Sequence, residues 1–256
     1  MASIGPGVEW QTGLAVVVFT VLAAGAARLG RLPTGWASVR AIARAVLQLV
    51  VVALVIGLVF DQVWGGVAFA LVMLTVATVT SAARSGVRPA VVWVAAAIVS
   101  GAAPVLAVVF GTGSTPVSAP SVIAICGIVI GGSMTACSLT LRRAFAALRE
   151  QRGQVEAALA LGFPRRQALQ LVVEPDRPEA LVPVLDQTRT VGLVTLPGAF
   201  VGVLLGGGSA GEAAAAQIIV LAGLIAAETI TVVVAANLVA AGRILPEDVA
   251  GSLPSQ

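Results

Sequence analysis

Glu228 has the clearest capacity for chemistry, because it places a carboxyl group in the middle of an apolar run, residues 213–241. A charge at that depth in a bilayer costs about 2.5 kcal/mol or more, so the side chain must face protein or water. One interpretation is a cation ligand or proton site on a transport path. The other is a protonated carboxylic acid that hydrogen-bonds a neighbouring helix.

A second candidate group lies in the run 121–141, where Cys126, Ser133, Cys137 and Thr140 recur at spacings of seven, four and three. Such spacings place residues on one face of a helix, with Met134 to one side. Thiol and thioether ligands suit softer metals, and Fe(II) accepts mixed oxygen, nitrogen and sulfur ligands. The alternative is that small side chains let two helices pack closely.

Arg40, Arg44 and Gln48 recur every four residues along the run 42–60. Arginines near the end of a span extend toward the interface, whereas the deeper Gln48 needs a partner. It is either a packing residue or part of a gate. The expected substrate path therefore comprises Glu228, Gln48 and the stripe on residues 121–141, with Glu228 and Cys137 as candidate metal ligands.

The elements that position these residues are membrane-spanning helices. The chain is 58% hydrophobic and 11% charged with mean hydropathy +1.02, whereas soluble domains carry about 25% charged residues. A spanning helix needs about 20 mostly apolar residues. We expect an all-α integral membrane protein, one permease-like domain over residues 1–256, with seven spans near residues 8–27, 42–60, 63–81, 90–110, 121–141, 191–205 and 213–241.

The cationic residues predict the orientation. All fifteen are arginines, and they fall in alternate connections between the spans, whereas the connections around Asp61, residues 111–120 and residues 206–212 contain none. Basic residues are enriched in cytoplasmic loops. The N-terminus is therefore expected outside and the C-terminus in the cytosol of a cell membrane.

Missing residue types exclude several function classes. The chain has no lysine, which the phosphate-binding loop of an ATPase requires. It has no histidine, so Ser–His hydrolysis and His-ligated zinc chemistry are excluded. A net charge of +3, carried by short loops, indicates membrane topology rather than nucleic-acid binding. We expect a transport protein that is not itself an enzyme and holds no cofactor.

The one sizeable polar region, residues 142–190, is expected in the cytosol as a docking segment. It contains the sequence EAALALG at residues 156–162, which matches the pattern E-A-A-x-x-x-G. A short helix, a glycine turn and a second short helix would form an element that fits a groove in a partner. An ordinary helical hairpin is the alternative interpretation of the same pattern.

Five segments together resemble the FetB-type iron-export ABC permease family. They are RAVLQL at residues 44–49, GGSMTACSL at 131–139, LREQR at 148–152, EAALALG at 156–162 and VGLVTLPGAFVG at 191–202. The resemblance covers most of the chain in the expected order. The stretch after Pro197 lacks the methionines and glutamine of many relatives, so the resemblance specifies the fold more closely than the substrate.

The resemblance implies a homodimeric permease that binds a separate ABC ATP-binding subunit, which would hold ATP and Mg²⁺. Docking would involve Glu156, Ala157, Ala158 and Gly162. The expected cargo is iron or a related metal cation, exported by alternating access. The alternatives are an organic or nucleotide-sugar substrate, a proton-coupled carrier that uses Glu228, and a membrane scaffold that transports nothing.

Glycine rows predict close helix contacts. Gly198, Gly202 and Gly206 repeat every four residues after Pro197, a spacing that lets helices approach within or between subunits. Pro197 and these glycines also predict that the sixth span is kinked or partly re-entrant.

Overall fold

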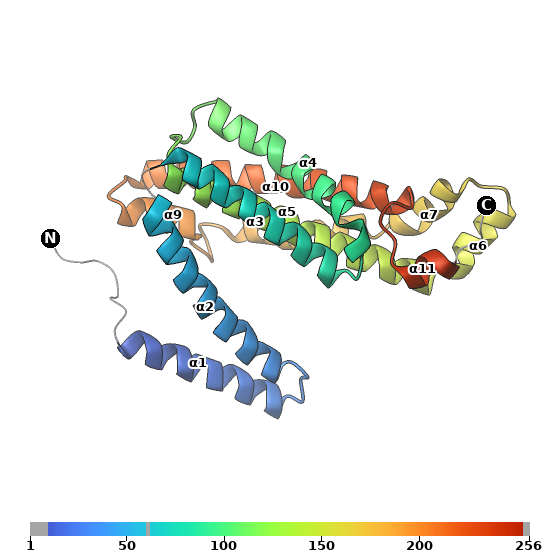
Figure 1. Ribbon diagram of the computed structural model, residues 1–256, viewed down its shortest axis with the longest axis horizontal. Coiled ribbons are helices and arrows are strands. Elements are labelled where there is room, and N and C mark those ends of the chain that lie inside the picture. The colour runs from blue at the N-terminus through green and yellow to red at the C-terminus, as the bar shows by residue number, and fades with distance from the viewer. Residues whose placement is uncertain (1–9, 60–61, 253–256) are drawn as a thin grey trace. The chain divides into compact units, whose positions relative to one another are not determined.

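The computed structural model describes residues 10–59 and 62–252, and within them the chain folds into helices without a β-strand (Figure 1). It forms two compact units, residues 1–61 and 62–256. Val8, Phe60 and Asp61, which were predicted at or between span ends, lie outside the described residues.

The first unit is a hairpin of two apolar helices, α1 (Trp10–Leu29) and α2 (Gly35–Val59). The turn between them is closed by hydrogen bonds, including one from the Leu32 amide to the Ala27 carbonyl at 2.8 Å. Both helices are long and apolar enough to cross a membrane.

The second unit is built on four long helices: α3 (Val63–Arg84), α4 (Val91–Gly111), α5 (Ala119–Glu150) and α10 (Ala210–Ala240). Its shorter elements are η1 (Arg88–Ala90), α6 (Arg152–Ala160), α7 (Arg165–Val173), η2 (Arg177–Leu181), α8 (Val182–Thr190), α9 (Gly198–Leu205) and α11 (Glu247–Ser252). Over the described residues of both units, six helices meet the length and hydropathy of a membrane span.

Local sequence signals explain where the two longest helices begin. The Ser118 side chain accepts a hydrogen bond from the Ser121 amide at the start of α5. Ser209 and Glu212 form a reciprocal capping box at the start of α10. These side chains satisfy amide groups that have no partner within the helix.

The core of the second unit lies where α5 and α10 pack together and against α3 and α4. The closest approach is at Gly101 of α4, where an added Cβ atom would collide with the Thr231 hydroxyl and the Ala227 carbonyl of α10. Gly66 and Gly132 are similarly close to Ala119 and Glu228. Glycine at these positions is what allows the helices to approach so closely.

One end of this bundle gathers several arginine side chains of the second unit, among them Arg88, Arg149 and Arg243. The Arg243 guanidinium lies 5.0 Å from the centre of the Trp93 ring. Arg149 makes two hydrogen bonds with the Asp248 carboxylate, at 2.7 and 3.2 Å, which holds the pKa of Asp248 below its ordinary value. Arg88 lines the same surface hollow as Arg149. These residues come from separate connections between the helices and lie at the same end of the bundle.

Segments η2 and α8 run alongside α10, from the end at which α10 finishes toward the end at which it begins (Figure 1). Arg177 contacts Asn237, Ala180 packs in a cluster with Val232, and Val184 packs in a cluster with Val220 and Leu224. From Asn237 to Val220 is about 26 Å along a helix axis. Residues 177–190 thus run beside the apolar stretch of α10 as a broken, partly polar segment.

The predicted sixth span, residues 191–205, does not form one helix. Residues 191–197 form turns, with Gly192 at φ +81° and hydrogen bonds from the Gly192 and Leu193 amides to the Thr195 and Thr190 carbonyls. Pro197 then begins α9, which has eight residues and is about 12 Å long. The break follows from a glycine in the left-handed region and a proline that cannot continue a helix.

The close approach at Gly101 generates a stability prediction. Gly101→Ala should lower the free energy of unfolding by about 1–3 kcal/mol, because α4 and α10 must separate to admit the methyl group. Gly131→Ala, on α5 with open space around its Cα, should leave stability unchanged or raise it slightly. Melting temperatures of the purified variants in detergent would test this, and equal melting temperatures would contradict the packing at Gly101.

Candidate functional site

The predicted docking motif forms the outer end of a helical hairpin made by α6 and α7. Gly162 has φ +86°, a left-handed conformation that ends α6 and turns the chain toward α7. Glu156 and Ala157 are exposed, and the Glu156 carboxylate accepts a hydrogen bond from Arg152 at 2.7 Å. Ala158 is buried against the hairpin itself, so it supports the tip rather than presenting a surface.

Two apolar side chains at this tip were not predicted. Leu161 is 79% exposed and Phe163 is 42% exposed, beside the motif glycine. Exposed large apolar groups that cluster at a polar tip are typical of a contact surface for another protein. The signal was in the sequence, since both residues flank Gly162, but their exposure depends on how α6 and α7 pack.

The hairpin is firmly joined to the long helices. Leu169, Val172 and Val173 of α7 are at most 1% exposed and belong to one apolar cluster with Phe145 of α5 and Ile244, which follows α10. A displacement of the hairpin must therefore move α5 and the end of α10, because buried contacts of this density do not slide independently.

Polar contacts add two further ties between η2 and these helices. Arg143 of α5 pairs with Glu179 at 3.0 Å, with both side chains about half exposed. Arg177 donates to the Asn237 side-chain oxygen of α10 at 3.4 Å and pairs with Glu174 at 3.3 Å. The Arg177 side chain is only 20% exposed, and its Nε has no hydrogen-bond partner within the described part of the chain.

Glu228 lies on α10 against α5 and is 8% exposed. A Cβ atom added at Gly132 would lie 2.7 Å from both the Glu228 Oε1 and the Leu224 Cδ2 atoms, so the carboxyl fills the space left by that glycine. No hydrogen bond or ion pair to this carboxyl is formed among residues 10–59 and 62–252. The arrangement leaves both oxygens available to a proton or a cation.

The stripe on α5 is buried throughout: Cys126, Ser133, Cys137 and Thr140 are all at most 6% exposed. Thr140 donates to the Ala136 carbonyl at 2.8 Å, whereas the Ser133 hydroxyl has no partner within the described residues. Both cysteines are free thiols. A substrate could reach this face only if α5 separated from its neighbours.

The remaining candidates are more dispersed. Across the described residues, no three His, Cys, Asp or Glu side chains gather closely enough to hold a metal ion. A metal between Glu228 and Cys137 would therefore need oxygen ligands of other kinds. Met134 is half-buried on α5, and Gln48 belongs to α2 in the first unit. Gln217, which was not predicted, is 4% exposed on α10, and its side-chain oxygen has no partner there.

The glycine row lies on and after α9. Pro197 is the N-cap of α9, and Gly206 is its C-cap. Cβ atoms added at Gly198 or Gly202 would meet nothing within 4 Å. Within the second unit these glycines therefore contact no neighbouring helix, and the face that they form is open.

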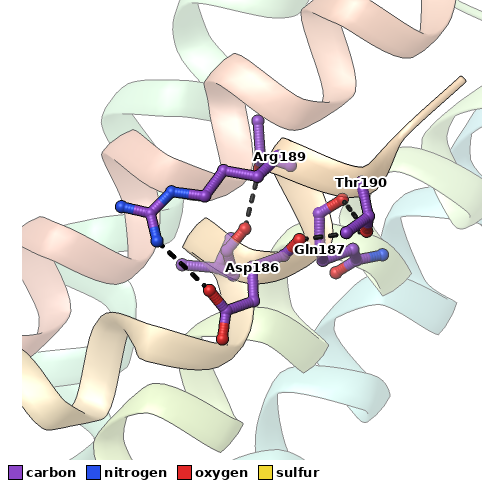
Figure 2. A network of polar contacts seen from close by, with 6 residues as sticks. Asp186, Gln187, Arg189 and Thr190 are labelled. Carbon is purple, nitrogen blue, oxygen red and sulfur yellow. Dashed lines mark hydrogen bonds and ion pairs between the residues drawn. The ribbon is translucent and has the colours of Figure 1, made fainter. Parts of the chain in front are cut away.

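Helix α8 carries a polar group near the end of the segment 142–190, which was predicted to dock in the cytosol. Figure 2 shows the Arg189 guanidinium directed toward the Asp186 carboxylate, and their N–O distance is 3.3 Å. The Thr190 hydroxyl donates to the carbonyls of Asp186 and Gln187, at 3.0 and 3.2 Å. These hydroxyl contacts add hydrogen bonds to carbonyl groups in the last turns of the helix.

Comparison with known proteins gives one family. A sequence profile described as "Uncharacterised protein family (UPF0014)" matches residues 10–243. UPF0014 membrane protein STAR2 of Oryza sativa subsp. japonica is 36% identical over 195 residues, which are 75% of this chain and 68% of that protein. Protein ALUMINUM SENSITIVE 3 of Arabidopsis thaliana is 33% identical over 193 residues, 74% of this chain and 71% of that protein.

One bacterial relative is named as a transport protein. The probable iron export permease protein FetB of Escherichia coli (strain K12) is 28% identical over 204 residues, 77% of each chain. No solved structure matches the chain. The matches to membrane proteins, with six helices of spanning length in the described residues, make this chain a multi-pass membrane protein.

The contact between Arg177 and Asn237 generates a second stability prediction. Arg177→Ala should lower the free energy of unfolding by about 1–3 kcal/mol, because it leaves Asn237 without this donor and removes a mostly buried side chain. Arg189→Ala, whose side chain is 74% exposed, should change it by less than about 0.5 kcal/mol. Unfolding in mixed micelles measures both, and equal effects would contradict the anchoring role of Arg177.

Proposed function

The chain belongs to the UPF0014 family of membrane proteins, and on that premise we propose that it is the membrane-spanning permease subunit of an ABC transporter. The observation that carries this proposal is the α6–α7 tip, where Glu156, Ala157, Leu161 and Phe163 are exposed around the Gly162 turn. A tip of this kind fits a groove in a separate ATP-binding subunit, which would supply ATP and Mg²⁺.

The proposed topology has seven crossings, with the N-terminus outside and the C-terminus in the cytosol. Six of these crossings are the long helices. The remaining one is the broken segment η2–α8, which follows α5 in crossing order and runs beside α10. This arrangement keeps Arg142, Arg149 and Arg243 on the cytosolic side, as the positive-inside rule requires. It also limits the docking segment to α6, α7 and the turns around them, and it places Arg189 outside the cytosol.

The buried contacts of α7 suggest how nucleotide binding would reach the membrane. Closure of two ATP-binding subunits would move the docked α6–α7 tips toward one another. Because Leu169 and Val172 are buried with Phe145, α5 would move with the tip. The ties of η2 to α5 and α10 would carry the same movement into the broken crossing. Alternating access of this kind requires no covalent chemistry on the cargo.

The proposed assembly is a homodimer, and the proposed cargo is iron or a related metal cation. The open glycine face of α9 supports a second copy, since small residues allow close helix contact in a membrane. The name of the Escherichia coli relative supports iron export. The buried Glu228 carboxyl, which has no protein partner in the described residues, is suited to a cation.

Docking can be tested by co-purification with the ATP-binding subunit. Glu156→Arg should abolish it by reversing a charge at the tip, and Leu161→Ser should weaken it by removing an exposed apolar contact. Gly162→Pro should abolish it as well, because proline cannot adopt φ +86°.

The matched control is Glu150→Arg, an equal charge reversal at an exposed position at the end of α5, before α6 begins and at the opposite end of that helix from the Gly162 turn. It should co-purify normally. All variants should still insert into the membrane and elute as the wild type does in detergent. Undiminished co-purification of Glu156→Arg and Leu161→Ser would overturn the docking assignment.

Cargo can be tested by iron efflux from preloaded cells that express the protein, lack it, or carry Glu228→Gln. Glutamine keeps the volume of the side chain but removes its negative charge, so efflux should fall to near the level of cells without the protein. Normal efflux with this variant would make Glu228 a packing residue. Unchanged efflux when the wild-type protein is deleted would reject iron as the cargo.

A further inference from the structure

The ionisable side chains of α8 lie beside the apolar stretch of α10. Leu181, which precedes α8, packs against the clusters that contain Val232 and Leu224. Asp186 follows five residues later, about 8 Å farther along a helix axis. Val184 packs in a cluster with Val220 and Leu224, which lie within a span of 31 residues. In the proposed topology, Asp186 therefore lies at the depth of the hydrocarbon layer.

The polar side chains of α8 face away from the rest of the second unit. The side chains of Asp186 and Arg189 are 61% and 74% exposed, and Gln187 is exposed as well. Val184, on the same helix, is 3% exposed and packs in the core. The helix thus has one apolar face toward α10 and an opposite face that this unit does not cover, which is polar at Asp186, Gln187 and Arg189 and apolar at Val182.

Lipid is a poor solvent for such a face. A carboxylate, a guanidinium and a primary amide at this depth are costly unless they meet water or polar protein groups. The segment that follows, residues 191–197, is non-helical, and residues 192–196 are exposed, so their backbone groups have the same requirement. Irregular backbone at membrane depth is tolerated only inside protein or along a water-filled cavity.

We propose that the Asp186–Gln187–Arg189 face of α8 lines a water-filled path through the membrane and that Asp186 contacts the transported metal cation there. The proposal deepens the proposed function and rests on it, since it assigns the path of the permease to particular residues. Water satisfies every exposed donor and acceptor of this face without needing a matched polar partner for each.

The chemistry of the face suits a cation in transit. The Asp186–Arg189 pair is solvent-exposed, so it is weak and readily exchanged. A divalent cation can replace the guanidinium at the carboxylate, with water completing its shell. Arg189, released from the pair, then disfavours the return of the cation by charge repulsion. Binding of this kind is brief, as passage through the membrane requires.

The direct test is the water accessibility of single cysteines. In a variant whose two native cysteines are replaced by serine, Gln187→Cys should react with a charged, membrane-impermeant methanethiosulfonate in native membranes. Only a thiolate in water reacts, so the rate should exceed that of Val72→Cys, on the apolar mid-part of α3, by about tenfold or more. Size-exclusion elution checks that each variant is folded.

Protection by the cargo tests the role of Asp186. Ferrous iron, kept reduced, should slow the modification of Gln187→Cys, and the added change Asp186→Asn should remove that protection while the thiol stays reactive. Magnesium serves as the control for ionic strength. Asp186→Glu, which keeps the carboxylate, should retain protection.

The outcomes separate this inference from the proposed function. If Gln187→Cys is as unreactive as Val72→Cys, the face is dry. If it forms a disulfide with a second copy, the face is covered by that copy. In either case the inference is wrong, even where the wild type exports iron. If the thiol is reactive but iron gives no protection that depends on Asp186, the cation contact is rejected. If the thiol is reactive and protected while cells show no iron efflux, the path stands and the proposed export of iron fails.

Discussion

The cost of leaving a polar group without a partner in hydrocarbon is the constraint on which this structure depends. It explains why the chain is helical, since a helix satisfies its own backbone within a membrane. It explains the side chains that cap the starts of α5 and α10. It also makes two places exceptional: the Glu228 carboxyl, which has no partner within the described residues, and the polar face of α8. A protein that transports a cation needs polar groups of this kind, because a bundle whose polar groups are all hydrogen-bonded to one another has no ligand for a cation.

Within the second unit, packed helices connect Glu228 and the polar face of α8 to the α6–α7 tip. Helix α7 is buried against α5 and the end of α10, and η2 is tied to the same two helices through Arg143 and Arg177. Helix α8 continues directly from η2. A force applied at the α6–α7 tip therefore has a short, packed route to both polar places. Gly101 and Gly132 hold α4, α5 and α10 so close that small rotations of α10 change what Glu228 touches.

Much of this organisation follows from the sequence alone. Hydropathy predicted the six long helices, and the glycine turn within EAALALG predicted the turn between α6 and α7. The span predicted at residues 191–205 does not form one helix, because Gly192 and Pro197 interrupt it although the stretch is apolar. A hydropathy window averages over such breaks and cannot locate them. The exposure of Leu161 and Phe163, and the fit of Glu228 against Gly132, depend on contacts between segments distant in the chain or on how two short helices pack.

The most direct measurement is iron movement in liposomes that contain the purified permease and its ATP-binding subunit, with no proton gradient across the membrane. ATP should drive iron across the bilayer, and the movement should cease when the ATP-binding subunit is catalytically inactive. Iron movement that requires a proton gradient and continues with the inactive subunit would contradict the account, because it would make the chain a proton-coupled carrier. Absence of iron movement beside normal ATP hydrolysis would leave a permease for a different cargo.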